Sequence, residues 1–381
     1  MPHRAEAPEG RRWRDLGVLV GAVLASRLLY LAVGVHFDVS PLSFFLQYAD
    51  PALLKSDLPR TLVHFHVDPP LMNAVIGVAL QAFGNQYGTA LHVVFLAAGV
   101  AFSLALYTLM RQLGVGSRTS LIVSLAFAIS PATVMFENLL YGDYLVAAAL
   151  VVAAVALHRF ASSGKGIPGI VAFSLLAGIV FSRSLFHLAW LLLIAAVVAW
   201  LLPRRRKHVL AVSLLPILAC VALYGKNLLM FDSFGAATCL GLNLSRVTTA
   251  QLPAADRSEL IRSGHISVLA DEDFYRLPSN RPDLFAAVPR SGIPVRDDLV
   301  KSTGSFNYNV DAYLPICWQY QADAVYVAVH RPSAVFHSVR ESLLIFFLPG
   351  SDYFVGLGKP SPMTPVARVF DAIAYGQVQM P

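Results

Sequence analysis

The sequence predicts an all-α polytopic membrane protein with about eight transmembrane helices and a small extracytoplasmic domain of mixed or unclear structure. Hydrophobic residues make up 56% of the 381 residues and charged residues only 14%, whereas soluble domains carry about 25% charged residues. The apolar residues come in long blocks, as they do in helices that cross a bilayer. This composition excludes a disordered chain, a collagen-like chain and a disulfide-rich mini-protein.

The first apolar block covers about residues 16–35 and is long enough to span a bilayer. Basic residues at 11–14 precede it, so a cleaved signal peptide is the alternative. The block contains Arg27, and no clear small-residue cleavage site follows it. We therefore expect a retained first helix with its N-terminus in the cytoplasm.

Seven more apolar blocks complete the predicted helices. Positive charge lies in the loops 111–118, 159–165 and 204–208, and cytoplasmic loops are enriched in Lys and Arg. Placing these three loops inside lets the helices alternate across the membrane. The blocks are 89–110, 119–136, 141–158, 167–182, 184–202, 208–226 and 334–349.

The apolar run 70–83 is too short for an easy span. If it crossed the bilayer, the loop 111–118 and every later basic loop would lie on the outer side. We therefore expect 70–83 to lie in the outer interface or to re-enter the membrane. Pro69 and Pro70 suit the start of such a helix, because proline is tolerated in a first turn.

Two stretches then face the outside. One is the acidic first loop, 36–88, and the other is the longer and more polar stretch 227–333. The predicted organisation is a transmembrane module over 1–226, an extracytoplasmic domain over 227–333, and a C-terminal membrane helix and tail over 334–381.

The net charge and the cysteines add to this picture. The charge of +6 indicates membrane topology and not nucleic-acid binding, because the basic residues sit beside apolar blocks. Cys220 falls in a predicted span and is expected in the core. Cys239 and Cys317 fall in the outer region, where a disulfide can persist, but their spacing does not decide whether they pair.

The first outer loop carries four carboxylates, Asp38, Asp50, Asp57 and Asp68. A carboxylate at a membrane boundary can be partly desolvated, which raises its pKa toward that of a useful base. Asp38, which closely follows the first helix, is the preferred candidate. The alternative for the other three is a solvated or helix-capping role, and for Asp57 that alternative is preferred.

His64 and His66 are two residues apart, so on a strand they would share a face. Together with Asp68 they can form a metal site. A single His-x-His pattern is a weak signal, and ordinary loop histidines are the alternative.

The second outer loop and a later span end supply further candidates. Glu137 and Asp143 flank this short loop, and acidic residues this close to hydrocarbon are often functional; the alternative is ordinary hydration at the interface. Arg183 lies at the outer end of a span, where it can snorkel to lipid headgroups or bind a phosphate. Lys226, His187 and Arg246 also fall near the outer face.

These residues resemble the GT-C superfamily of integral-membrane glycosyltransferases, and most closely the relatives of protein O-mannosyltransferases and lipid A aminoarabinose transferases. The resemblance covers about residues 16–230. Two departures are Asp68, where family members often have Gln or Lys before Pro-Pro, and the few spans after the outer domain. The matching motifs are acidic Asp38 and Asp50, the element from His66 to Leu71 followed by Asn73, Glu137 with Tyr141, and Gly178 to Arg183.

The resemblance implies an inverting transfer of a sugar from a polyprenyl-phosphate donor to a glycan, lipid or protein acceptor at the outer face of a bacterial inner membrane. Asp38 would be the base, and Asp68 or Glu137 would share that role or orient the acceptor. Arg183, with Lys226, would offset charge on the departing phosphate. Some relatives use a divalent metal, Mg or Mn, and others do not. His66, Tyr141 and Asp143 complete the expected substrate-binding set.

Two other functions remain open. A transporter or lipid-linked sugar flippase would need polar or broken helices near the bilayer midplane, whereas the mid-span residues here are mostly Ala, Leu and Val. A non-catalytic scaffold that displays the outer domain is the second alternative. An Asp38→Asn variant separates an enzyme from a scaffold, because only the enzyme would lose turnover.

Overall fold

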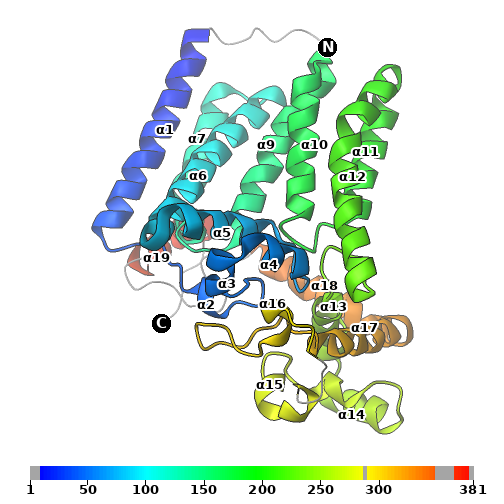
Figure 1. The fold of residues 1–381 in the computed structure, drawn as a ribbon. Coiled ribbons are helices and arrows are strands. Elements are labelled where there is room, and N and C mark those ends of the chain that lie inside the picture. Colours follow the sequence, from blue (N-terminus) through cyan, green and yellow to red (C-terminus); the bar gives the residue numbers. More distant parts are fainter. Residues whose placement is uncertain (1–8, 286–289, 348–363, 377–381) are drawn as a thin grey trace. The chain divides into compact units, whose positions relative to one another are not determined.

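The computed structural model describes residues 9–285, 290–347 and 364–376. Within these ranges the chain is helical and has no strand, apart from two isolated bridges (Figure 1). Four helical stretches are long and apolar enough to cross a membrane, and the count rises to five if one bent pair is a single span. The protein is therefore all-α and membrane-like. The four stretches are Arg12–Ala32, Leu71–Gln112, Gly142–Ser163 and Pro203–Phe231.

The chain divides into two compact units. The first comprises residues 1–41, 82–220 and 349–381, and the second comprises 42–81 and 221–348. In the first unit, long helices run side by side, with α6 against α7 and α9 and with α9 against α10 (Figure 1). Its helices are α1 (Glu9–Ala32), α6 (Tyr87–Gln112), α7 (Ser117–Ile129), α8 (Pro131–Glu137), α9 (Gly142–Ser163), α10 (Gly166–Val180), α11 (Leu188–Leu201), most of α12 (Arg206–Phe231) and α19 (Thr364–Tyr375).

Local sequence explains where these helices end. Pro131 has no N–H and disfavours helical backbone at Ser130, so α7 stops there and α8 leaves at a bend of 56°. The Ser130 hydroxyl accepts from the Thr133 N–H and so caps α8. After α9, Gly164 takes a left-handed φ of 71°, which glycine adopts without a steric penalty.

The predicted count of eight spans is not confirmed. Two of the expected spans, α10 and α11, are apolar helices of only 15 and 14 residues, and the expected span 119–136 is the bent pair α7 and α8. The helix in the last expected block, α18 (Pro332–Phe346), is not among the spans that the described residues contain. It carries Arg340 and Glu341 in its interior, which makes a lipid-facing crossing costly.

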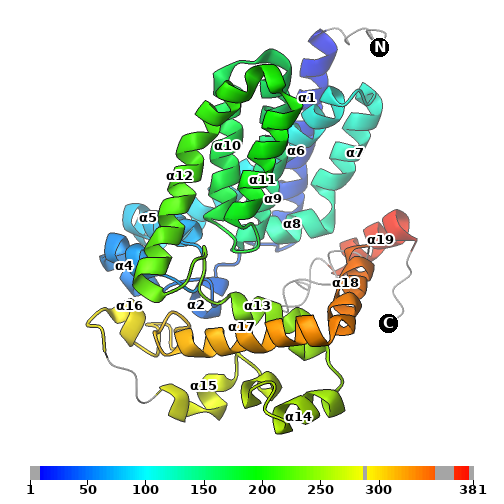
Figure 2. The same ribbon diagram turned by 90° about the vertical axis from the view of Figure 1, so that its right-hand side faces the viewer.

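Most helices of the second unit are short. Helix α5 continues through a 3-10 turn at Gly84–Gln86 into α6, so the run 70–83 is helical, and its place in the interface stays a prediction. Figure 2 shows α17 and α18 meeting at an angle, where Pro332 prevents one continuous helix. The remaining helices are α2 (Pro41–Phe44), α3 (Pro51–Ser56), α4 (Leu58–His64), α5 (Leu71–Phe83), α13 (Leu240–Val247), α14 (Ala254–Arg262), α15 (Leu277–Asn280), α16 (Pro294–Asp297) and α17 (Tyr313–His330).

Helices α13 and α17 form the covalently linked core of this unit. Cys239 and Cys317 form a disulfide with their Cα atoms 5.0 Å apart, which answers the question that the spacing left open. Gly241 lies against the backbone of α17, where a Cβ would collide with the Cys317 carbonyl and the Gln321 N–H. An aromatic cluster packs beside them: Phe274, Phe285, Phe306, Tyr308, Tyr313 and Tyr320.

Most of the first loop, residues 42–81, belongs to the second unit, although we expected it with the N-terminal module. The side-chain oxygen of Asn309 accepts from the backbone N–H groups of His66, at 2.7 Å, and Val67, at 3.1 Å. The buried Lys301 ammonium donates to the carbonyls of Phe45 and Tyr48. These bonds join segments that are more than 240 residues apart in the chain.

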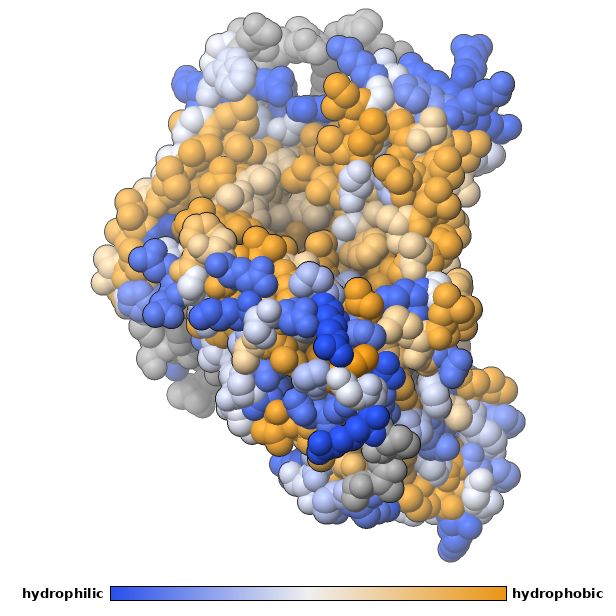
Figure 3. All heavy atoms as spheres, viewed as in Figure 1, coloured by the Kyte–Doolittle hydropathy of each residue, from blue (hydrophilic) through white to orange (hydrophobic). Residues whose placement is uncertain are grey.

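Hydrophobic residues cover the outward faces of the first unit's long helices. Figure 3 shows them as a broad area over these helices, with hydrophilic residues gathered at the helix ends. Among the exposed side chains are Leu28, Leu29, Ile122, Leu193 and Leu215. A surface of this kind is expected where helices face lipid.

Candidate functional site

Asp38 is anchored to the second outer loop by a short backbone pairing. Its N–H donates to the Asn138 carbonyl at 2.7 Å, and its carbonyl accepts from the Leu140 N–H at 2.8 Å. The Asp38 side chain is exposed, and its Oδ1 accepts from the Ser40 N–H at 2.8 Å. The structure therefore fixes the backbone of the predicted base next to the second acidic loop and leaves its carboxylate accessible.

The predicted substrate-binding residues Tyr141, Asp143 and Arg183 lie together. The Arg183 guanidinium contacts both Asp143 oxygens, with Nε 2.6 Å from Oδ1 and Nη2 3.0 Å from Oδ2. Nη2 also donates to the Tyr141 hydroxyl at 3.0 Å, and the guanidinium lies over the Tyr141 ring. Burial raises the pKa of Tyr141 to about 12, so this residue is a neutral phenol at physiological pH.

Two consequences follow for a ligand at this cluster. The Arg183 side chain is 23% exposed and that of Asp143 is 41% exposed, so solvent and a ligand can reach the pair. Tyr141 is one residue after Leu140, which pairs with Asp38. An accessible carboxylate and an accessible guanidinium thus belong to one local framework of the first unit.

Glu137 has a different environment from the one we expected for a catalytic residue. Its side chain is fully buried and forms a two-pronged ion pair with Arg27 of α1, with both N···O distances at 2.7 Å. The Tyr144 hydroxyl donates to Glu137 Oε2 at 2.7 Å. Arg27 also donates to the Ala128 carbonyl. Both carboxylate oxygens are occupied, which favours a role in holding α1, α8 and α9 together.

The other loop carboxylates lie in the second unit. Asp50 caps α3 by accepting from the Ala52 N–H, and it also accepts from the Ser302 N–H and hydroxyl. This is the capping alternative raised for it from the sequence. Asp57 precedes α4 and has no side-chain capping bond. Asp68 is half-buried just before α5.

His66 is fully buried in the second unit and is held on several sides. Its Nδ1 lies 2.9 Å from the Thr238 hydroxyl, and its ring packs on Phe231. Among the residues that the structure describes, its Nε2 has no hydrogen-bond partner, and it lies 3.9 Å from an Asp311 oxygen. Burial, together with the positive charges of Lys226 and Arg296, lowers the pKa of His66 to about 3. The ring is therefore neutral.

Two cations lie near His66, and only one of them, Lys226, was a candidate from the sequence. Lys226, a predicted phosphate partner, donates to the carbonyls of Val63 and Phe65 at 3.0 and 2.9 Å. Arg296 forms an ion pair with Asp311, with the closest N···O distance at 2.7 Å. Arg296 and Asp311 were not among the candidates from the sequence, because their contacts with Phe231 and His66 join segments that are distant in the chain.

The metal site that His64, His66 and Asp68 could form is not assembled among the described residues. No group of three His, Cys, Asp or Glu side chains in those ranges has an arrangement that would hold a metal ion. His64 ends helix α4 and His66 follows it in a loop, so they do not share the face of a strand. Whether the protein uses Mg or Mn stays a prediction.

The candidate residues fall into two groups, one in each unit. Of the other cations noted near the outer face, Arg246 donates to the Tyr275 hydroxyl, and His187 precedes α11. The first unit holds Asp38, Glu137, Tyr141, Asp143 and Arg183, and the second holds Asp50, Asp68, His66 and Lys226.

Comparison of the chain with protein-family models, curated proteins and solved structures finds no match. The resemblance to GT-C enzymes therefore depends on the residues alone. The chain is assigned here to the all-α proteins with helices able to span a membrane.

Proposed function

We propose that this protein is a membrane glycosyltransferase of the GT-C type that moves a sugar from a polyprenyl-phosphate donor to a hydroxyl acceptor. The observation that carries the proposal is the framework of the first unit, in which the accessible Asp38 is paired by its backbone to the loop that leads into the Tyr141–Asp143–Arg183 cluster. A base and a phosphate-binding cation are the two groups that this reaction requires.

In the proposed reaction, the acceptor oxygen attacks the anomeric carbon of the sugar and inverts it. The bond between that carbon and the lipid phosphate oxygen breaks, and its electron pair leaves with the phosphate. Asp38 takes the proton of the acceptor hydroxyl. Arg183 stabilises the charge that builds on the phosphate, because a guanidinium matches phosphate oxygens in geometry and charge.

Asp143 and Tyr141 act on the orientation of Arg183. The two-pronged contact with Asp143 and the stacking on Tyr141 fix the plane of the guanidinium before a ligand arrives. A cation that is already oriented toward the reacting phosphate does not have to be reoriented as charge develops there, so it stabilises the transition state more effectively. In this proposal Glu137 is structural, because its oxygens are taken by Arg27 and Tyr144.

The disulfide supports placing the second unit outside the cytoplasm. Disulfides persist in oxidising compartments and are rare in the cytosol, and Cys239 and Cys317 both belong to that unit. The proposed location is a bacterial inner membrane, with the chemistry at the outer face. The acceptor is a glycan, lipid or protein of the cell envelope.

Purified protein in nanodiscs, incubated with radiolabelled polyprenyl-phosphate sugars and membrane extract, tests the proposal. We expect label transfer or donor hydrolysis with wild type and a loss of at least about 100-fold with Asp38→Asn, the contribution expected of a general base. Asp57→Asn is the matched control, because Asp57 is an exposed loop carboxylate without a side-chain capping bond.

Each other outcome has a defined meaning. Transfer that survives in Asp38→Asn keeps the enzyme class and moves the base to another carboxylate. If folded wild-type protein consumes no donor, the transferase proposal is wrong and the flippase or scaffold functions take its place.

A further inference from the structure

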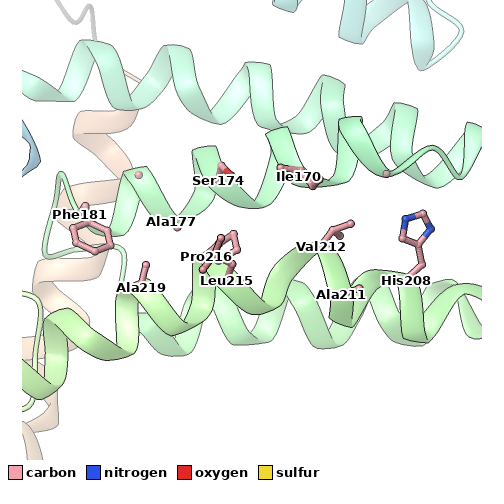
Figure 4. A pocket seen from close by; sticks show the side chains of 12 residues that line it. Ile170, Ser174, Ala177, Phe181, His208, Ala211, Val212, Leu215, Pro216 and Ala219 are labelled. Carbon is pink, nitrogen blue, oxygen red and sulfur yellow. The ribbon is translucent and has the colours of Figure 1, made fainter.

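A groove between helices α10 and α12 is not used by the proposed reaction. Its volume is about 620 Å³, and of the twelve residues that line it only Ser174 and His208 have polar side chains. Figure 4 shows side chains of the two helices facing each other across it, with Phe181 at one end and His208 at the other. All of these residues belong to the first unit.

The groove has the length and chemistry to take a hydrocarbon chain. It extends along α10 from Gly166 to Phe181, which at 1.5 Å per residue is roughly 22 Å. One leaflet of the hydrocarbon core is about 15 Å thick, half of the ~30 Å total. Pro216, which lines the groove, has no N–H to donate to the carbonyl four residues earlier, so α12 lacks one of its backbone hydrogen bonds there.

The His208 end of the groove is strongly basic. Lys165 directly precedes the lining residue Gly166, and Lys207 directly precedes His208; both lysines are exposed. The run 204–207 is Arg-Arg-Arg-Lys, and no residue from 144 to 231 is acidic. This positive charge therefore has no carboxylate within the whole stretch of chain that forms the groove.

The opposite end has a different electrostatic character. Phe181 is two residues before Arg183, but that guanidinium is already paired with Asp143. Net positive charge thus gathers at the His208 end, whereas the charge of Arg183 is balanced by Asp143 and that side chain already serves the proposed reaction. An amphiphile with an anionic head would therefore be oriented with its head at His208. Basic pockets between transmembrane helices bind the headgroups of anionic lipids.

We propose that the groove between α10 and α12 is a binding site for an anionic glycerophospholipid, with one acyl chain along the groove and the phosphate headgroup at Lys165, Lys207 and His208. The site is separate from the proposed transferase chemistry and does not depend on it. Such a lipid would fill the gap between two helices, and one of them, α10, is only 15 residues long.

Native mass spectrometry of the full-length protein tests this site, with phosphatidylglycerol and phosphatidylcholine as the probes. We expect wild type to retain one phosphatidylglycerol molecule in preference to phosphatidylcholine. Ala219→Phe places a ring in the groove, and we expect it to reduce retention at least tenfold. Ala196→Phe on α11 is the matched control, because Ala196 and Ala219 are both exposed but only Ala219 lines the groove.

A second pair of variants tests the headgroup end. Lys165→Gln with Lys207→Gln should lower the preference for phosphatidylglycerol by about fivefold for each lysine, since a basic residue near an anionic surface contributes ~1 kcal/mol. Arg118→Gln, an exposed basic residue that does not line the groove, should leave the preference unchanged.

Three results would overturn the site. The first is equal retention of the two lipids by wild type, and the second is unchanged retention in Ala219→Phe. The third is displacement of phosphatidylglycerol by an equimolar polyprenyl phosphate, because that result would identify a groove for the carrier lipid. Size-exclusion chromatography establishes that each variant is folded, and Ala211→Phe, which fills the same groove, replaces Ala219→Phe if the latter aggregates.

Discussion

Removing the charge of Glu137 tests whether this buried residue is structural. In Glu137→Gln the Arg27 guanidinium keeps its charge but loses its counter-ion and one of the two acceptor oxygens that it contacts at 2.7 Å. The Arg27 side chain is 8% exposed and that of Glu137 is 0% exposed, so water cannot replace the lost partner. Breaking one side of a buried pair costs about 3–5 kcal/mol, and we expect that loss of unfolding free energy.

A double-mutant cycle isolates the pair. The double variant Arg27→Met with Glu137→Gln leaves no unpaired charge. We therefore expect its unfolding free energy to be at least 2 kcal/mol higher than the sum of the two single changes predicts. This lies within the coupling range of roughly 0.5–3 kcal/mol for contacting residues. The assay is reversible unfolding in mixed micelles, followed by circular dichroism. Glu341→Gln is the control, because its ion pair with Arg340 is exposed and exposed pairs contribute ~1 kcal/mol or less.

Two results would refute this reasoning. One is a Glu137→Gln protein that unfolds with the free energy of wild type. The other is a double variant that is as stable as wild type but has lost all donor turnover, which would return Glu137 to the catalytic role that the sequence predicted for it.

Three further predictions concern the second unit. The folded-state pKa of His66, about 3, is below its ordinary value of ~6.5. The stability that the neutral His66 ring contributes is therefore complete above pH 6.5 and is lost as the pH falls toward 3. Chemical unfolding should show a loss of about 1.4 kcal/mol in unfolding free energy between pH 7.5 and 5.5, and the His66→Gln variant should not show it. Replacing Cys239 and Cys317 by Ser should cost about 4.5 kcal/mol by the chain-entropy estimate for a loop of 78 residues, measured as a lower unfolding midpoint that reductant does not lower further. Gly241→Ala should lower the melting temperature of oxidised protein, because its Cβ meets the backbone of α17; an unchanged value would contradict that packing.

The sequence predicted the helices with long apolar runs, and it placed the candidate residues of the first unit, Tyr141, Asp143 and Arg183, on one side of the membrane. Helices α6, α9 and α12 correspond to predicted blocks because a bilayer-spanning run has a strong compositional signal. Tyr141, Asp143 and Arg183 were expected on the same side, at the ends of neighbouring spans, and the structure brings them into contact. Alternating topology placed these residues on one side of the membrane, and their contact is what the structure adds.

Other features required information that no local pattern carries. His66 owes its burial to Asn309, Thr238 and Asp311, which are between 172 and 245 residues further along the chain. The partner of Glu137 had a readable signal, since a charge within a span needs a counter-ion and Arg27 was visible in the first apolar block. The bend at Pro131 was also readable, yet block length alone suggested one straight span.

The contacts of Asn309 with the first loop have a consequence for synthesis of the chain. The bond between the Asn309 side chain and the His66 N–H joins residues 243 positions apart. At 5–20 residues per second, Asn309 is made about 12 to 50 s after His66. During that interval the backbone N–H groups of His66 and Val67 lack the acceptor that Asn309 provides in the folded protein. We therefore expect nascent chains stalled before residue 309 to be cut by protease within 42–81, and release of the complete chain to end that sensitivity.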